Sequence, residues 1–95
     1  MRDTIVTGVT SGGFEFTSDV RAIRDMEFLE DLANVDKNPL VLPKLCERML
    51  GTSGKKALYD FCRDDDGYVT AEAIEPVFTD ILKILSEKSK EVKNS

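Results

Sequence analysis

The feature that most constrains the fold of this chain is a change in the spacing of its apolar residues near Ser18. Before that point, apolar residues lie on both sides of a turn-like run, Thr10 to Gly13: Ile5, Val6, Val9, Phe14 and Phe16. β-branched and aromatic residues around a Gly-Gly turn predict a short β-hairpin over residues 1–17. Two strands alone are marginal in water, so we expect the hairpin to pack on other elements or pair with another chain.

From residue 18 to residue 85 the apolar residues recur every three or four positions, which predicts about four amphipathic helices. The first begins at Ser18 or Asp19 as N-cap, and its expected buried face is Ala22, Met26, Leu29, Leu32 and Ala33, flanked by Ile23 and Phe28. The second starts regularly near Leu40 to Leu42, after Asn38-Pro39, with Pro43 in its open first turn. Its apolar stripe is Leu42, Leu45, Cys46, Met49 and Leu50.

Gly51 follows this stripe and suits a left-handed C-cap. A third helix then begins at Thr52 or Ser53, with its apolar face formed by Ala57, Leu58, Phe61 and Cys62. The fourth begins after Thr70 as N-cap, and its core positions are Ile74, Val77, Phe78, Ile81, Leu82 and Leu85. Ile84 falls off this face, so we expect it to be exposed.

The chain has 95 residues, of which 41% are apolar, enough for one folded domain with one core. We therefore expect a mainly α fold: a single domain over residues 1–85, with the hairpin followed by a small helical bundle. Residues 86–95 contain one apolar side chain, Val92, and are expected to form a frayed helix end or a flexible polar tail.

The charge and the residues that are missing exclude several classes of function. The net charge of −5 disfavours nucleic-acid binding, because a phosphate backbone requires a basic face. The chain contains no His, which removes imidazole bases and His-containing zinc sites. No apolar run is long enough to span a membrane, and no secretory signal is visible. We expect a protein that is not an enzyme and has no cofactor, catalytic residue or resident metal.

Two motifs with possible chemistry have simple structural interpretations. With Gly67 placed on the invariant glycine of an EF-hand loop, Asp64 and Asp66 fall on ligand positions. Cys62 and Ala73 then occupy the first and last ligand positions, where oxygen ligands are needed. A polar turn is favoured, and a calcium-responsive EF-hand-like module or another helical protein-interaction module is the alternative. Cys46 and Cys62 lie on apolar faces and are expected to be reduced core thiols.

A domain of this size has little interior, so some apolar residues are expected to serve an interface with a partner or a second copy. The candidates lie on the hairpin and on the last helix: Phe14, Phe16, Phe78, Ile81, Ile84 and Leu85.

The order of several segments resembles the small tail assembly chaperones of long-tailed bacteriophages and prophages, especially those of Gram-positive hosts. The similarity covers roughly Gly12 to Leu85. The segments that carry it are the Gly-Phe-Glu-Phe strand, the run Asp25 to Ala33, Asn38 to Leu45, Met49 to Gly51, Lys55 to Asp60 and Asp66 to Thr70. They are helix patterns and include no catalytic signature.

The resemblance implies a role in virion morphogenesis. Such chaperones coat the long, aggregation-prone tape measure protein in the host cytoplasm and are absent from the mature virion. A longer form made by programmed frameshifting is thought to recruit the tail tube protein, so this chain would be the shorter form. Many copies on one client make a homo-oligomer plausible. The resemblance implies no nucleic-acid or membrane partner, and it marks no contact residue.

Overall fold

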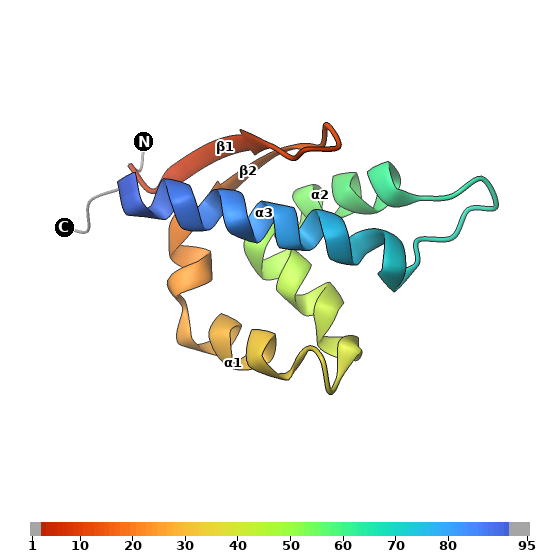
Figure 1. Cartoon of the computed structure of the whole chain (residues 1–95), viewed down its shortest axis with the longest axis horizontal. Helices are drawn as coiled ribbons and strands as arrows, with labels where there is room; N and C mark the ends of the chain where they lie inside the picture. The colour runs from red at the N-terminus through yellow and green to blue at the C-terminus, as the bar shows by residue number, and fades with distance from the viewer. Residues whose placement is uncertain (1–2, 92–95) are drawn as a thin grey trace.

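The computed structural model describes residues 3–91 and is mainly helical, with one two-stranded sheet (Figure 1). In chain order its elements are β1 (Ile5–Val9), β2 (Glu15–Asp19), the 3-10 helix η1 (Val20–Arg24), α1 (Met26–Asn34), the 3-10 turn η2 (Pro39–Val41), α2 (Leu42–Cys62) and α3 (Ala71–Glu91). The predicted class, a hairpin followed by helices, is confirmed. Residues 3–91 contain three α-helices where about four were predicted, because the second and third predicted helices form one element interrupted at Gly51.

The second and third predicted helices form one element, α2, with a break at Gly51. This residue has φ of 76° and ψ of 174°, a conformation that is essentially limited to glycine. The positive φ expected at Gly51 is therefore present. The helical turns resume directly after it, so the two predicted helices form one kinked helix. Leu42 begins α2, with Pro43 in its first turn, as predicted.

The first predicted helix is divided at Asp25, and its predicted buried face is wrong. Asp25 is extended, with φ of −71° and ψ of 131°, and its carboxylate accepts a hydrogen bond from the Phe28 N–H at 2.9 Å. This N-cap starts α1 in a different rotational register from the preceding 3-10 helix. Consequently Phe28 is fully buried, whereas Met26 is 68% exposed and Leu29 is 40% exposed.

The strands pair antiparallel, from Ile5 opposite Asp19 to Val9 opposite Glu15. β2 thus continues beyond the predicted end of the hairpin, and Ser18 belongs to the strand. Asp19 caps η1 by accepting a hydrogen bond from the Arg21 N–H, as one of the two predicted caps. Gly8 lies opposite Phe16, and a Cβ added there would be 2.7 Å from the Phe16 ring and 3.0 Å from Ile84. The missing side chain therefore lets the ring and α3 pack closely on β1.

The hairpin and α1 lie on opposite sides of α3, and α2 crosses behind them (Figure 1). Every one of these elements contributes to a single core. Its buried apolar residues are Phe14, Phe16, Val20, Phe28, Leu42, Leu45, Cys46, Met49, Leu50, Leu58, Ile74, Phe78, Ile81 and Leu85. Among residues 3–91, no helix is both long and apolar enough to cross a membrane.

α3 starts where predicted, because the Thr70 hydroxyl accepts a hydrogen bond from the Ala73 N–H at 3.2 Å. It ends later than expected, at Glu91, so residues 86–91 of the predicted tail are helical. The Arg24 guanidinium donates to the Ser89 hydroxyl at 3.0 Å and to the Ser89 carbonyl at 2.8 Å. These bonds hold the last turns of α3 against η1. Residues 92–95 lie outside the described part of the chain.

Candidate interaction surface

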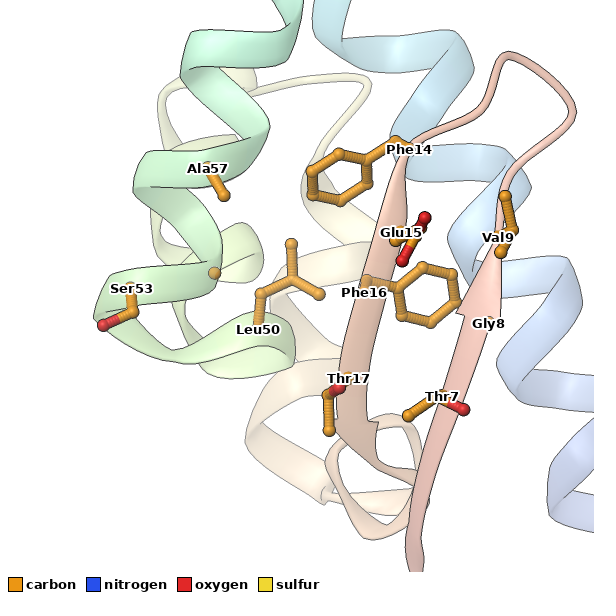
Figure 2. A pocket seen from close by; sticks show the side chains of 11 residues that line it. Thr7, Gly8, Val9, Phe14, Glu15, Phe16, Thr17, Leu50, Ser53 and Ala57 are labelled. Atoms are coloured by element: carbon orange, nitrogen blue, oxygen red, sulfur yellow. The ribbon is translucent and has the colours of Figure 1, made fainter.

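An open groove of about 860 Å³ lies between the hairpin and the second half of α2 (Figure 2). Its floor is formed by the buried side chains Phe14, Phe16 and Leu50. The helix wall consists of Ser53, Gly54 and Ala57, and the strand wall of Thr7, Gly8, Val9, Glu15 and Thr17. Glu15 is the one charged residue among those that line the groove. The groove therefore combines an apolar floor with walls of mostly small, uncharged side chains.

The break at Gly51 directs the helix wall of the groove. After the break, Ala57 presents its small side chain toward the hairpin (Figure 2), and Ser53 and Gly54 also line the groove. Gly54 packs directly on the preceding turn, since a Cβ added there would be 2.7 Å from the Leu50 Cβ. Small residues at a helix face let another backbone approach closely, so this wall suits a packed chain better than a single small molecule.

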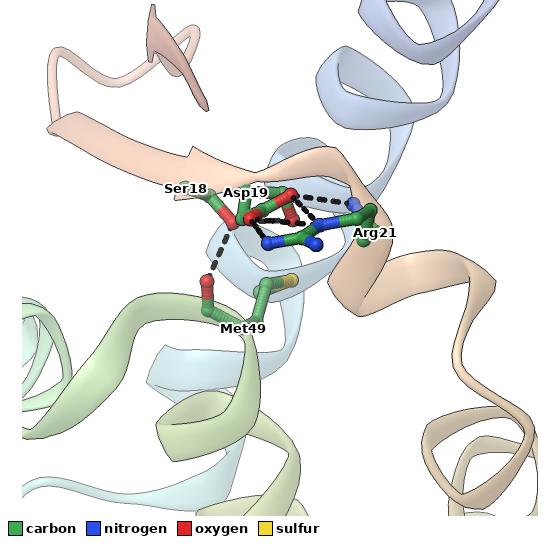
Figure 3. A network of polar contacts seen from close by, with 4 residues as sticks. All are labelled: Ser18, Asp19, Arg21 and Met49. Carbon is green, nitrogen blue, oxygen red and sulfur yellow. Dashed lines mark hydrogen bonds and ion pairs between the residues drawn. The ribbon is translucent and has the colours of Figure 1, made fainter. Parts of the chain in front are cut away.

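The base of the hairpin is attached to α2 near the same break (Figure 3). The Ser18 hydroxyl donates a hydrogen bond to the Met49 carbonyl at 2.5 Å, in the turn before Gly51. This satisfies a carbonyl where the regular helix is interrupted. Beside it, the Arg21 guanidinium donates to the Asp19 carboxylate at 2.6 Å. Hydrogen bonds from Arg21 hold the pKa of Asp19 well below its ordinary value.

The tip of the hairpin is attached to α3 and to the end of α2. The Ser11 N–H donates to the Asp80 carboxylate at 2.6 Å, and this bond lowers the pKa of Asp80. The rings of Phe14 and Phe61 are 5.3 Å apart and tilted by 54°. Contacts at both ends therefore fix the strand wall of the groove relative to its helix wall.

The six residues predicted to contact a partner are mostly in the core. Phe14, Phe16, Phe78, Ile81 and Leu85 are buried, so their side chains offer almost no surface to a partner in this conformation. Phe14 and Phe16 still line the floor of the groove, whereas no residue of α3 lines it. Ile84 is half-buried beside Gly8, not exposed as expected. Partner contact through these residues stays a prediction.

Sequence reasoning missed the most exposed apolar side chains. Leu40 is 83% exposed and Tyr68 is 70% exposed. Leu40 lies beside a small, mostly apolar pocket of about 200 Å³, lined by Pro39, Leu40, Leu42, Pro43, Tyr59, Val69, Ala71 and Ile74. One signal was available, because Leu40 lies outside the buried stripe that starts at Leu42.

The Asp-rich loop after α2 forms a hydrogen-bonded turn. The Asp64 carboxylate accepts hydrogen bonds from the N–H groups of Asp66 at 3.0 Å and Tyr68 at 2.9 Å. The Arg63 guanidinium donates to the Gly67 carbonyl at 2.9 Å. One oxygen of the Asp64 carboxylate, Oδ1, thus closes the turn. Within residues 3–91, no group of three or more His, Cys, Asp or Glu side chains is placed to hold a metal ion.

Both cysteines are free thiols, as predicted. Cys46 is buried, and Cys62 is half-buried. Burial raises the pKa of the Cys46 thiol to about 11 and also raises that of Cys62. The thiolate is the nucleophile, so Cys46 is chemically inert near neutral pH while the core stays closed.

Comparison with protein-family models, with curated proteins and with solved structures finds no match to this chain.

Proposed function

We propose that this chain is a tail assembly chaperone of a long-tailed bacteriophage or prophage. It binds the tape measure protein in the host cytoplasm and keeps it soluble until the tail tube assembles around it. The sequence resemblance over Gly12 to Leu85 suggests the phage context. The groove between the hairpin and α2 is the observation that supports binding of a client chain. A longer frameshifted form recruits the tail tube protein in this proposal.

The groove has the properties needed to receive an amphipathic helix. Its lining includes the exposed apolar side chains of Val9 and Ala57 around the buried Phe14, Phe16 and Leu50, and apolar contact supplies affinity in helix-in-groove recognition. The small side chains of Ser53 and Ala57 leave room for a helix to lie close to α2. The whole chain carries a net charge of −5, which keeps a coated client in solution by repulsion between complexes.

The test is co-expression with the tape measure protein from the same locus, followed by affinity purification of this chain. We expect the client to become soluble and to co-purify, and mass spectrometry of the eluate then identifies any longer frameshifted product. A client that stays insoluble in the presence of the wild-type chain contradicts the proposal.

A pair of variants tests whether the groove is the binding site. Ala57→Glu places a carboxylate on the helix wall and is expected to abolish co-purification. Thr52→Glu adds the same charge at an exposed position outside the groove and is expected to leave it intact. Equal binding by both variants would show that the client binds elsewhere.

A further inference from the structure

The outer edge of β1 has no neighbouring strand among the described residues. The sheet contains β1 and β2 alone. The Val20 N–H donates to the Thr4 carbonyl and the Thr10 N–H to the Phe14 carbonyl, each at 2.9 Å. Antiparallel strands alternate, so the even-numbered residues of β1 bond to β2. The backbone N–H and C=O groups of Ile5, Thr7 and Val9 therefore point away from β2, toward the open edge.

Edge strands are usually protected by charges, a proline, a β-bulge or a covering helix, and β1 lacks the first three. α3 packs on the Gly8 side of β1 and accepts the Ser11 N–H beyond its end, while Ile5, Thr7 and Val9 stay exposed. The sequence of β1 is Ile-Val-Thr-Gly-Val, and its register with β2 is continuous. Ile5 is 42% exposed and Val9 is 57% exposed on the outer face of the hairpin. The other edge, on β2, lies on the side of α2, to which Ser18 is bonded (Figures 2 and 3).

We infer that β1 pairs with β1 of a second copy of this chain, antiparallel and about a two-fold axis at Thr7. In this register Ile5 lies opposite Val9 of the second copy, and Thr7 lies opposite Thr7. All the outward N–H and C=O groups of these residues gain partners. Each exposed Ile5 gains an apolar cross-strand neighbour. The two hairpins form one four-stranded sheet, and the inference does not depend on the identity of the client.

The distribution of charge favours this edge over the other. Copies with a net charge of −5 repel one another, but β1 is uncharged. In the inferred register Asp3 lies opposite Ser11, whose N–H donates to the Asp80 carboxylate, so the approach of like charges, Asp3 to Asp80, lies beyond the ends of the paired strands. The equivalent pairing of two β2 strands about Thr17 would place Glu15 opposite Asp19. Like charges directly opposite are destabilising, so the second copy is expected at β1.

The experiment is analytical ultracentrifugation of the full chain over a wide range of concentrations. We expect a reversible dimer. The double variant Ile5→Lys with Val9→Lys places like charges opposite each other across the inferred pair. It is expected to raise the dimer dissociation constant by roughly a hundredfold. Within each hairpin the new lysines lie opposite Asp19 and Glu15, so the fold is retained.

Two further variants separate the register from general charge effects. Ile5→Lys with Val9→Glu and Glu15→Lys pairs opposite charges both between the copies and within each hairpin, and is expected to restore the dimer. Thr17→Lys, on the same outer face but on β2, is expected to leave the dissociation constant unchanged. A wild-type chain that is monomeric at every concentration overturns the inference, as does a dimer that the double lysine variant leaves intact. Dissociation of the triple variant, with its hairpin intact by NMR, overturns the two-fold register.

Discussion

The helices α2 and α3 each span 21 residues and each contains a residue that disfavours helix, yet only α2 is broken. In α2 the backbone leaves helical geometry at Gly51. In α3 the helix continues through Pro76, which lies in its second turn. A proline removes one N–H donor and its ring crowds the carbonyl four residues before it, but it keeps a helical φ, and the helical assignment of α3 continues through it.

The distribution of buried side chains explains why one helix stays whole. In α3 the buried residues Ile74, Phe78, Ile81 and Leu85 extend on both sides of the proline turn. In α2 nearly all buried residues precede Gly51, and Leu58 is the one that follows it. The second half of α2 is thus held by less packing, and it is this half that forms the wall of the groove. The groove proposed to bind a client is thus formed by the less tightly packed part of the fold.

Truncation of the stripe in α3 is expected to have the largest effect. Ile81 is fully buried, so Ile81→Ala should lower the free energy of unfolding by about 3 kcal/mol through lost burial and a cavity. Urea denaturation followed by circular dichroism measures this. Leu40→Ala, at the most exposed apolar side chain, is the control and should change stability little. A loss below about 1 kcal/mol for Ile81→Ala would mean that packing does not hold α3 together.

The second prediction concerns the break in α2. Gly51→Ala should lower the free energy of unfolding by about 1–3 kcal/mol, because a Cβ opposes this combination of positive φ and extended ψ. An added Cβ would have no atom within 4 Å, so the cost comes from backbone conformation alone. Gly12→Ala is the matched control, since its Cβ would meet only Phe61, at 4.0 Å. Equal stability of both variants in thermal denaturation would show that the break at Gly51 needs no glycine.

A smaller effect of opposite sign is expected in α3. Pro76→Ala restores the missing N–H donor, which should raise the free energy of unfolding by about 1 kcal/mol. The gain falls short of the full cost of an interior proline, because alanine also increases the freedom of the unfolded chain. Differential scanning calorimetry measures the change. A lower melting temperature would instead assign the proline ring a stabilising contact.

The smallest effect concerns the two hydrogen bonds that attach the hairpin, from Ser11 to Asp80 of α3 and from Ser18 to Met49 of α2. Only the first contains a group that titrates, the Asp80 carboxylate. The pKa of Asp80 is lowered in the folded state by the bond from Ser11, so this carboxylate stabilises the fold above about pH 4. The contribution is lost as the pH falls through the folded-state pKa. Asp80→Asn should therefore be slightly less stable than wild type at neutral pH and equal to it at strongly acidic pH.

The attachment to α2 provides the control for that titration. Ser18→Ala leaves the Met49 carbonyl without its donor, and neither group titrates in this range. Its deficit relative to wild type should stay constant as the pH falls. Melting temperatures of the three proteins between neutral and acidic pH distinguish the two attachments. A difference between Asp80→Asn and wild type that persists in acid would show that the charge of Asp80 is not what stabilises the tip.

Backbone features that depend on the type of one residue were predicted correctly from the local sequence. The Gly-Gly turn, the Thr70 cap and the positive φ at Gly51 were all predicted from residue type and spacing. Asp25 was missed, although Asp is a good N-cap, because the apolar spacing from Ala22 to Ala33 fits one continuous helix. As a result the predicted buried face of α1 was wrong, because Phe28 is buried and Met26 is exposed.

The groove could not be predicted from the local sequence, because its walls come from segments that are far apart in the chain. Its helix wall is separated from β2 by α1 and the first half of α2. Ser53 and Ala57 have no property that marks a binding surface until the bond from Ser18 to Met49 places the hairpin opposite them. For the same reason Phe14 and Phe16 were assigned to a partner, although the helices of the same chain bury them.

The rate at which a reagent modifies the Cys46 thiol reports how often the surrounding core opens. Its thiol is buried one turn before the break in α2 and has a pKa raised to about 11, so a thiol reagent reacts only after this region opens. The modification rate of Cys46, measured separately from that of the half-buried Cys62, therefore reports the frequency of that opening without any introduced label. A client or second copy that stabilises the closed state slows the modification of Cys46, and a tighter binder slows it more.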